Sequence, residues 1–241
     1  MENVKGQIEE RILYSNALKE EMTLMIYKPA NFSPLYKYHV LIAQDGQDYF
    51  SMGRIASLAD ELLGNKEIQN IIIVGIPYKD VQERKEKYHP KGSKYKEYLR
   101  FLGHELTSYL DKEFPTYQMG MGRGLIGDSL AGTVSLLAAL HYPNTFGNVI
   151  LQSPYVNNHV LDKVGEFNDT HLLTFYHVIG TKETDVKTTD GKTKDFVVPN
   201  RDLHKLMKEK NFTVSYEEFE GDHTWTYWQP DLRKALKVIY G

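Results

Sequence analysis

A serine flanked by small residues lies near the middle of the chain, in the stretch Gly127-Asp128-Ser129-Leu130-Ala131-Gly132. An apolar run typical of a strand precedes it, and small and branched apolar residues typical of a helix follow it. Gly127 and Ala131, two before and two after the serine, allow a sharp strand-to-helix turn without side-chain collision. The helix N-terminus beside the serine would favour an oxyanion. Ser129 is therefore a candidate nucleophile, although Asp128 or Ser129 could also be a plain helix cap.

A serine hydroxyl needs a general base to become a good nucleophile. Where the serine occupies such a turn, an acid and then a histidine follow it along the chain. The histidines after Ser129 are His141, His159, His171, His177, His204 and His223. Those at 141, 177 and 204 fall within predicted helices or a predicted strand, where histidines are more often structural. His223 follows the last predicted strand and precedes the last predicted helix, so we predict that it is the base.

The acid of such a triad is expected after the preceding strand, which we predict over residues 171–180. The residues that follow include two carboxylates, Glu183 and Asp185. Either could orient the imidazole of His223 and stabilise its charged form. We prefer Glu183 and keep Asp185 as the alternative, and the other carboxylate would then be an ordinary solvated loop residue.

An oxyanion hole in this kind of site needs two backbone N–H groups. One belongs to the residue after the nucleophile, Leu130. The turn Gln44-Asp45-Gly46-Gln47 follows a predicted buried strand and contains a glycine that permits a close approach. We expect the second donor to be the N–H of Gln47, although the same residues also fit a turn with no chemical role.

Strands and helices alternate along the chain that must position these residues. Periodicity predicts strands over residues 6–15, 21–27, 38–43, 71–76, 124–127, 149–153, 171–180 and 213–219. It predicts helices over residues 55–63, 98–114, 131–141, 203–210 and 232–239. This order predicts an α/β fold whose mainly parallel central sheet has antiparallel N-terminal edge strands. We expect a surface loop over the charged residues 78–96 and an inserted loop over the polar residues 181–200.

The composition is that of an ordinary globular protein, with 41% hydrophobic and 25% charged residues among 241. This length predicts a single domain spanning residues 1–241. The net formal charge, 29 − 32 = −3, predicts no binding to nucleic acid or to an anionic membrane. The absence of cysteine excludes disulfides, thiolate zinc sites and a cysteine nucleophile. We expect neither a signal peptide nor a membrane span, and therefore a cytoplasmic protein.

Four stretches of the sequence, in order, resemble the esterase family that includes esterase D, feruloyl esterases, ferric-siderophore esterases and the mycolyltransferases. They are residues 43–50, 127–132, 179–184 and 220–228, the last of which contains Gly-Asp-His-x-Trp-x-x-Trp. Arg84, Tyr98 and Leu99 also match residue types common in that family. Many relatives have glycine where this chain has Ala131, which is small enough that no loss is expected.

The resemblance covers nearly the whole chain and implies an α/β-hydrolase fold with helices on both faces of the sheet. It implies Ser129, Glu183 and His223 as the catalytic triad, with Leu130 and Gln47 as oxyanion donors. It implies no metal and no organic cofactor. Because family members are often dimers, a homodimer is also possible.

We therefore expect a serine esterase that hydrolyses a small-molecule carboxylic ester through an acyl-enzyme on Ser129. An acyltransferase using the same residues, or a binding protein that keeps the fold without the chemistry, remain as alternatives. Trp225, Tyr227 and Trp228 lie near His223 in the sequence. They could form the wall of an aromatic cleft or simply pack the last helix against the sheet.

Overall fold

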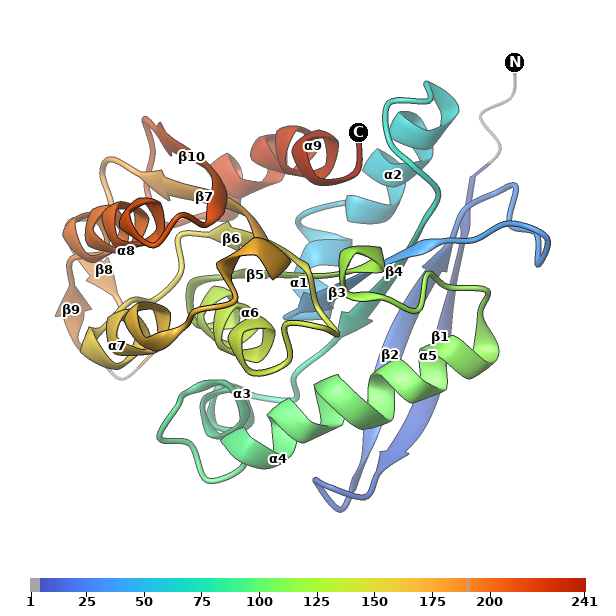
Figure 1. Ribbon diagram of the computed structural model, residues 1–241, viewed down its shortest axis with the longest axis horizontal. Coiled ribbons are helices and arrows are strands. Elements are labelled where there is room, and N and C mark those ends of the chain that lie inside the picture. Colours follow the sequence, from blue (N-terminus) through green and yellow to red (C-terminus); the bar gives the residue numbers. More distant parts are fainter. Residues whose placement is uncertain (1–4, 190) are drawn as a thin grey trace.

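An eight-stranded sheet crosses the computed structural model, which describes residues 5–189 and 191–241 (Figure 1). Its strand order is β1-β2-β4-β3-β5-β6-β7-β10. The strands are β1 (Gln7–Ser15), β2 (Glu20–Lys28), β3 (His39–Gln44), β4 (Ile71–Ile76), β5 (Arg123–Asp128), β6 (Asn148–Gln152), β7 (Thr174–Gly180) and β10 (Thr213–Phe219). The β1–β2 and β2–β4 pairs are antiparallel, and every other pair is parallel. The predicted mainly parallel sheet with an antiparallel N-terminal edge is thus confirmed.

Helices cover both faces of this sheet, as Figure 1 shows. One face carries α1 (Gly46–Ser51), α2 (Ile55–Gly64) and α9 (Trp225–Tyr240). The other carries α3 (Val81–Tyr88), α4 (Tyr95–Arg100), α5 (Thr107–Glu113), α6 (Ser129–His141), α7 (Asn158–Glu166) and α8 (Val197–Glu209). Alternate residues of the central strands enter opposite cores: Ile42 packs on the α6 side and Leu41 on the α2 side. Burial on both faces explains why these strands are continuous apolar runs in the sequence.

The prediction of a surface loop over residues 78–96 was wrong, because helix α3 lies within it and α4 begins at its end. The Asp80 side chain caps α3 by accepting a hydrogen bond of 2.8 Å from the N–H of Glu83. The helix buries Arg84, Lys87 and Tyr88. Two of these three buried residues are charged, so the helix lacks the apolar period by which helices are recognised.

The polar residues 181–200 are not a single inserted loop. They contain a small hairpin of β8 (Val186–Lys187) and β9 (Thr193–Lys194), and their last four residues begin α8. The predicted helix over residues 98–114 is also divided, since a π-helical turn, Phe101–Leu106, separates α4 from α5. Helices α1 and α7 were not predicted, because both are short. That residues 1–241 form one domain stays a prediction.

None of the helices in the described part of the chain is long and apolar enough to cross a membrane.

Candidate active site

Ser129 lies at the junction of β5 and α6, with the left-handed backbone angle φ of 50°. Such an angle is strained for a non-glycine residue and is found where the surrounding structure imposes it. A Cβ atom on Gly127 would lie 2.3 Å from the carbonyl carbon of Ala131, so only glycine fits there. Asp128 occupies the helix cap position, but its side chain makes no capping hydrogen bond. The turn therefore has the sharp geometry that projects a serine from the carboxyl end of a sheet.

His223 lies in the loop between β10 and α9, and its Nδ1 is 2.6 Å from Oε2 of Glu183. Because a carboxylate oxygen can only accept, Nδ1 carries the proton and Nε2 is left as a base. Glu183 is buried, whereas Asp185 is exposed and accepts a hydrogen bond from its neighbour Thr184. Of the two predicted acids, the structure brings Glu183 and not Asp185 to the histidine.

Ser153 holds the buried carboxylate of Glu183 from the opposite side. Its hydroxyl donates to Oε1 of Glu183 over 2.6 Å and accepts from the indole N–H of Trp228 over 3.1 Å. The N–H of Gly180 donates to the same Oε1 over 2.8 Å. Ser153 has a φ of 48° and is completely buried. Sequence reasoning missed this residue, because a serine before a proline at a strand end is also an ordinary turn.

A cavity of about 300 Å³ opens beside these residues, and Ser129, Leu130 and His223 all line it. Further lining side chains come from the β3–α1 turn and α3, and others from the β8–β9 hairpin. Tyr155 and Phe196 add aromatic surface to its wall. The predicted nucleophile, the predicted base and one predicted oxyanion donor therefore share a single cleft of the size that accommodates a small molecule.

The two predicted oxyanion donors are placed differently around this cavity. Leu130 lies at the N-terminus of α6, where backbone N–H groups have no intrahelical acceptor. Gln47 lies in the first turn of α1, and its side chain accepts a hydrogen bond of 3.2 Å from the N–H of Tyr78. Gln47 is not among the residues that line the cavity, but Asp45 and Asp48 on either side of it are.

Three ionisable residues form a buried group at the cavity wall: Asp45, Arg84 and Asp128. The Arg84 Nε lies 2.9 and 2.8 Å from the two carboxylate oxygens of Asp45, and a terminal guanidinium nitrogen lies 2.6 Å from one of them. Burial, reinforced by the negative charge of Asp45, raises the pKa of Asp128 to about 8. Asp128 is therefore mostly neutral at pH 7. The sequence motif gave no sign of this, since the environment of Asp128 comes from α1 and α3.

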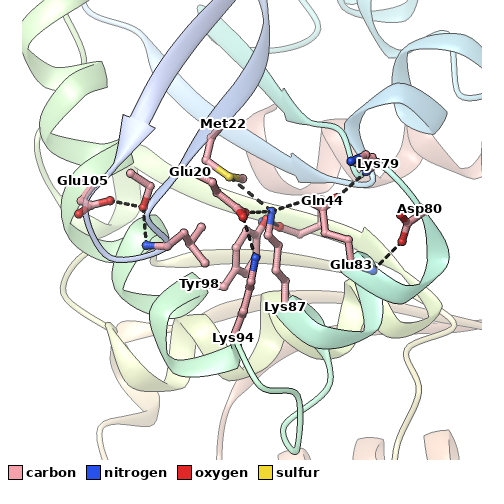
Figure 2. A network of polar contacts seen from close by, with 12 residues as sticks. Glu20, Met22, Gln44, Lys79, Asp80, Glu83, Lys87, Lys94, Tyr98 and Glu105 are labelled. Atoms are coloured by element: carbon pink, nitrogen blue, oxygen red, sulfur yellow. Dashed lines mark hydrogen bonds and ion pairs between the residues drawn. The ribbon is translucent and has the colours of Figure 1, made fainter.

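Ion pairs behind the cavity fix the position of α3, which carries Arg84. Figure 2 shows Lys87 of α3 reaching Glu20 of β2, 2.6 Å away, and Glu83 of its own helix, 2.8 Å away. Glu20 also contacts Lys94 at 2.7 Å. Burial alone would raise the pKa of Glu20, but the hydrogen bonds from Lys87 and Lys94 lower it overall. These contacts fasten α3 to the β1–β2 hairpin, and so hold Arg84 against Asp45.

The aromatic residues near His223 have different roles. Trp228 lines the cavity, and its ring centre is 4.8 Å from that of His223. Trp225 packs on Tyr49, with ring centres 4.8 Å apart. Tyr227 stacks on Phe219. The aromatic-cleft hypothesis therefore applies to Trp228, and the packing interpretation to the other two.

None of the other histidines considered above, at positions 141, 159, 171, 177 and 204, lines this cavity. His177 is buried in β7, with its Nε2 2.8 Å from Oδ1 of Asn200, and His204 stacks on Tyr216. Within residues 5–189 and 191–241, no group of three or more His, Asp or Glu side chains is arranged to hold a metal ion.

A family model described as "Putative esterase" matches residues 15–239. The uncharacterized protein YjcH of Bacillus subtilis (strain 168) is 57% identical over 234 residues, which are 97% of this chain and 98% of YjcH. An acetyl esterase of Caldicellulosiruptor saccharolyticus is 22% identical over 93% of this chain and 94% of its own. A solved ferulic acid esterase has a TM-score of 0.81 at 16% identity and covers 98% of both chains, so the fold is shared.

Proposed function

This chain belongs to the esterase family and is a carboxylic ester hydrolase, and we propose that it cleaves a small-molecule ester through an acyl-enzyme on Ser129. His223 is the general base, and Glu183 is the acid that orients it. The observation that carries the proposal is the 2.6 Å contact between His223 and Glu183, at the wall of the cavity that also contains Ser129. This contact supports His223 as a proton acceptor that is held in a fixed orientation, at the same cavity as the strained Ser129.

The reaction has two halves that use the same groups. His223 Nε2 takes the proton of Ser129 as the serine oxygen attacks the ester carbonyl carbon, and the oxyanion accepts hydrogen bonds from backbone N–H groups. His223 then gives that proton to the departing alcohol, which leaves an acyl-enzyme. Water, deprotonated by His223, attacks the acyl carbon, and Ser129 is released with its proton restored. Glu183 accepts the hydrogen bond from His223 Nδ1 and stabilises the imidazolium in each half.

The N–H of Leu130 is the first proposed oxyanion donor and that of Gln47 the second. The place of Leu130 at the N-terminus of α6 and at the cavity wall supports its role. The support for the Gln47 N–H as second donor is less direct and comes from the packing of the preceding residue, Gly46. A Cβ there would lie 2.4 Å from the backbone of β4, so the turn that carries Gln47 is closely packed and well positioned.

Replacement of the nucleophile tests this proposal. We expect Ser129→Ala to lose on the order of 10⁴-fold in kcat on a p-nitrophenyl acyl ester, because no other group can form the acyl-enzyme. The wild-type protein should be labelled at Ser129 by a fluorophosphonate, and the variant should not. Glu183→Gln should lose activity strongly, whereas the matched change Asp185→Asn should have little effect. Full activity of Ser129→Ala would rule the mechanism out.

A further inference from the structure

We propose that Asp128, the residue before the nucleophile, is a specificity-determining residue that binds a hydroxyl group of the substrate. Asp128 lines the cavity that Ser129 also lines, and one of its carboxyl oxygens makes no hydrogen bond in the described part of the chain. This inference rests on the proposed function, because it assumes that the ester lies at Ser129.

The position of Asp128 is the first observation. It is the last residue of β5, lines the same cavity as Ser129 and is only 7% exposed. Its Oδ1 is buried and has no hydrogen-bond partner in the described part of the chain. An unpartnered buried polar atom is costly, and at the wall of a cavity a bound ligand can supply the missing hydrogen bond. An unpaired oxygen at the wall of a cavity therefore indicates a polar ligand.

The charges around Asp128 indicate what kind of ligand this is. The groups that act on it are Asp45 from the β3–α1 turn, Asp48 and the Tyr49 hydroxyl from α1, and Arg84 from α3. Arg84 is already bound by both oxygens of Asp45, and it lowers the pKa of Asp128 less than burial and Asp45 raise it. In this setting the neutral carboxyl is favoured, with one O–H donor and one acceptor oxygen. A hydroxyl group matches both functions, whereas an ammonium group would need an ionised carboxylate.

The sequence adjacency of Asp128 and Ser129 limits where that hydroxyl can lie. Neighbouring Cα atoms are about 3.8 Å apart, so the carboxyl cannot reach far from the reacting carbon. The hydroxyl therefore lies within a few bonds of the scissile ester. Hydroxy-acyl esters and esters of polyols both meet this condition.

The test compares esters that differ only in their hydroxyl groups, by one in the first pair and by two in the second. The first pair is p-nitrophenyl 3-hydroxybutyrate and p-nitrophenyl butyrate, and the second is glyceryl monobutyrate and propyl butyrate. For each pair the measured quantity is the ratio of kcat/KM values, hydroxylated over unhydroxylated. We expect a ratio above one for the wild type in at least one pair. Asp128→Leu should lower that ratio about tenfold, and Asp128→Asn should largely retain it, because an amide both donates and accepts.

The pH dependence of the same ratio separates contact from a purely structural role. As pH rises through the pKa of about 8, Asp128 ionises and loses its donor. The wild-type preference for the hydroxylated ester should therefore decline above pH 8, while that of Asp128→Asn stays level. A pH effect on the catalytic step that both esters share cancels in the ratio. This readout needs only the near-isosteric Asn variant, so it remains available if Asp128→Leu does not fold.

Two results would overturn the inference. One is a ratio of one in the wild type for both pairs, and the other is a ratio unaffected by both substitutions and by pH. The change Asp185→Asn, at an exposed carboxylate outside the cavity lining, is the matched control and should leave the ratio as it is. Fluorophosphonate labelling of Ser129 in the same samples distinguishes a failure of this inference from a failure of the proposed function. If Ser129 is labelled and Ser129→Ala loses esterase activity but the ratio does not respond, this inference alone fails.

Discussion

Three hydrogen-bond donors surround the buried carboxylate of Glu183: the His223 ring, the Ser153 hydroxyl and the N–H of Gly180. A buried carboxylate needs such partners, because an ion without them is costly in a low-dielectric environment. A Cβ on Gly180 would lie 2.7 Å from Oε1 of Glu183, so the backbone approach requires glycine. The serine and the glycine therefore determine where the carboxylate can be, and through it the orientation of His223.

Ser153 can be tested as a positioning residue. We expect Ser153→Ala to lower kcat/KM by roughly 5- to 100-fold, because it removes one hydrogen bond from a buried charged group. Ser153→Gly should lose a similar amount, although glycine accepts the left-handed φ at this position without strain. Steady-state kinetics with a p-nitrophenyl ester measure both, and Thr184→Ala in the exposed loop is the control. Wild-type kinetics in the glycine variant would show that the hydroxyl has no role.

At the level of elements, α3 is a helix formed largely by charged residues that nonetheless buries one face. Lys87 is 4% exposed and lies between Glu20 and Glu83, so it takes the place that an apolar residue would have in an ordinary amphipathic helix (Figure 2). The Tyr98 hydroxyl of α4 donates a hydrogen bond to the Gln44 side chain at the end of β3. The Tyr88 hydroxyl of α3 accepts a hydrogen bond of 3.2 Å from the backbone N–H of Asp45. Helices α3 and α4 thus support the turn on which Asp45 and Gln47 lie.

Removal of the buried ammonium group of Lys87 should therefore destabilise the packing of helix α3 on the protein. We expect Lys87→Met to reduce the free energy of unfolding by about 1–3 kcal/mol, since it leaves Glu20 and Glu83 without their shared partner. Urea denaturation measures this loss. Lys85→Met on the exposed side of the same helix should stay within about 0.5 kcal/mol of the wild type. Equal stability of the two variants would contradict the anchoring role of Lys87.

On the scale of the whole molecule, the sheet separates two apolar cores and carries one buried histidine between its C-terminal strands. His177 of β7 pairs in register with Leu151 of β6 and Tyr216 of β10. Its Nε2 donates to Asn200, because the Asn200 amide nitrogen already donates to Pro154 and Phe196. Its Nδ1 has no hydrogen-bond partner in the described residues. Protonation would therefore place an uncompensated charge inside the protein.

This histidine should make the fold sensitive to acid. Burial, with a smaller contribution from His204, lowers the pKa of His177 from 6.5 to about 4, against the opposing hydrogen bond to Asn200. Between these pH values the unfolded chain binds more protons, so the free energy of unfolding falls as pH is lowered from 6.5 to 4. The expected loss is on the order of 2–3 kcal/mol. Urea denaturation across this range should show a shallower pH dependence for His177→Gln than for the wild type.

The matched control is His171→Gln, at an exposed histidine just before β7. It should have the pH dependence of the wild type. If the free energy of unfolding of His177→Gln also has the pH dependence of the wild type, other groups cause the acid sensitivity.

The order of strands and helices could be predicted from the sequence, because it depends on local patterning. Runs such as residues 71–76 are apolar at every position and become strands buried on both faces. The glycine and small residues around Ser129 likewise predict a strand-to-helix turn, because steric fit at Gly127 is a local property. The order of Ser129, Glu183 and His223 along the chain could also be predicted, since it follows from the order of the elements.

Other features depend on contacts between residues far apart in the sequence, and only the tertiary structure decided them. Glu183 and Asp185 are equivalent by spacing, yet only Glu183 is turned inward to His223, 40 residues away. Helix α3 has no apolar period, because its buried face is stabilised by a carboxylate of β2. The neutral state of Asp128 depends on its burial and on the negative charge of Asp45 from the β3–α1 turn, against the opposing charge of Arg84 from α3. Local sterics thus determined that Ser129 is presented on a turn, and long-range burial and charge determined what surrounds it.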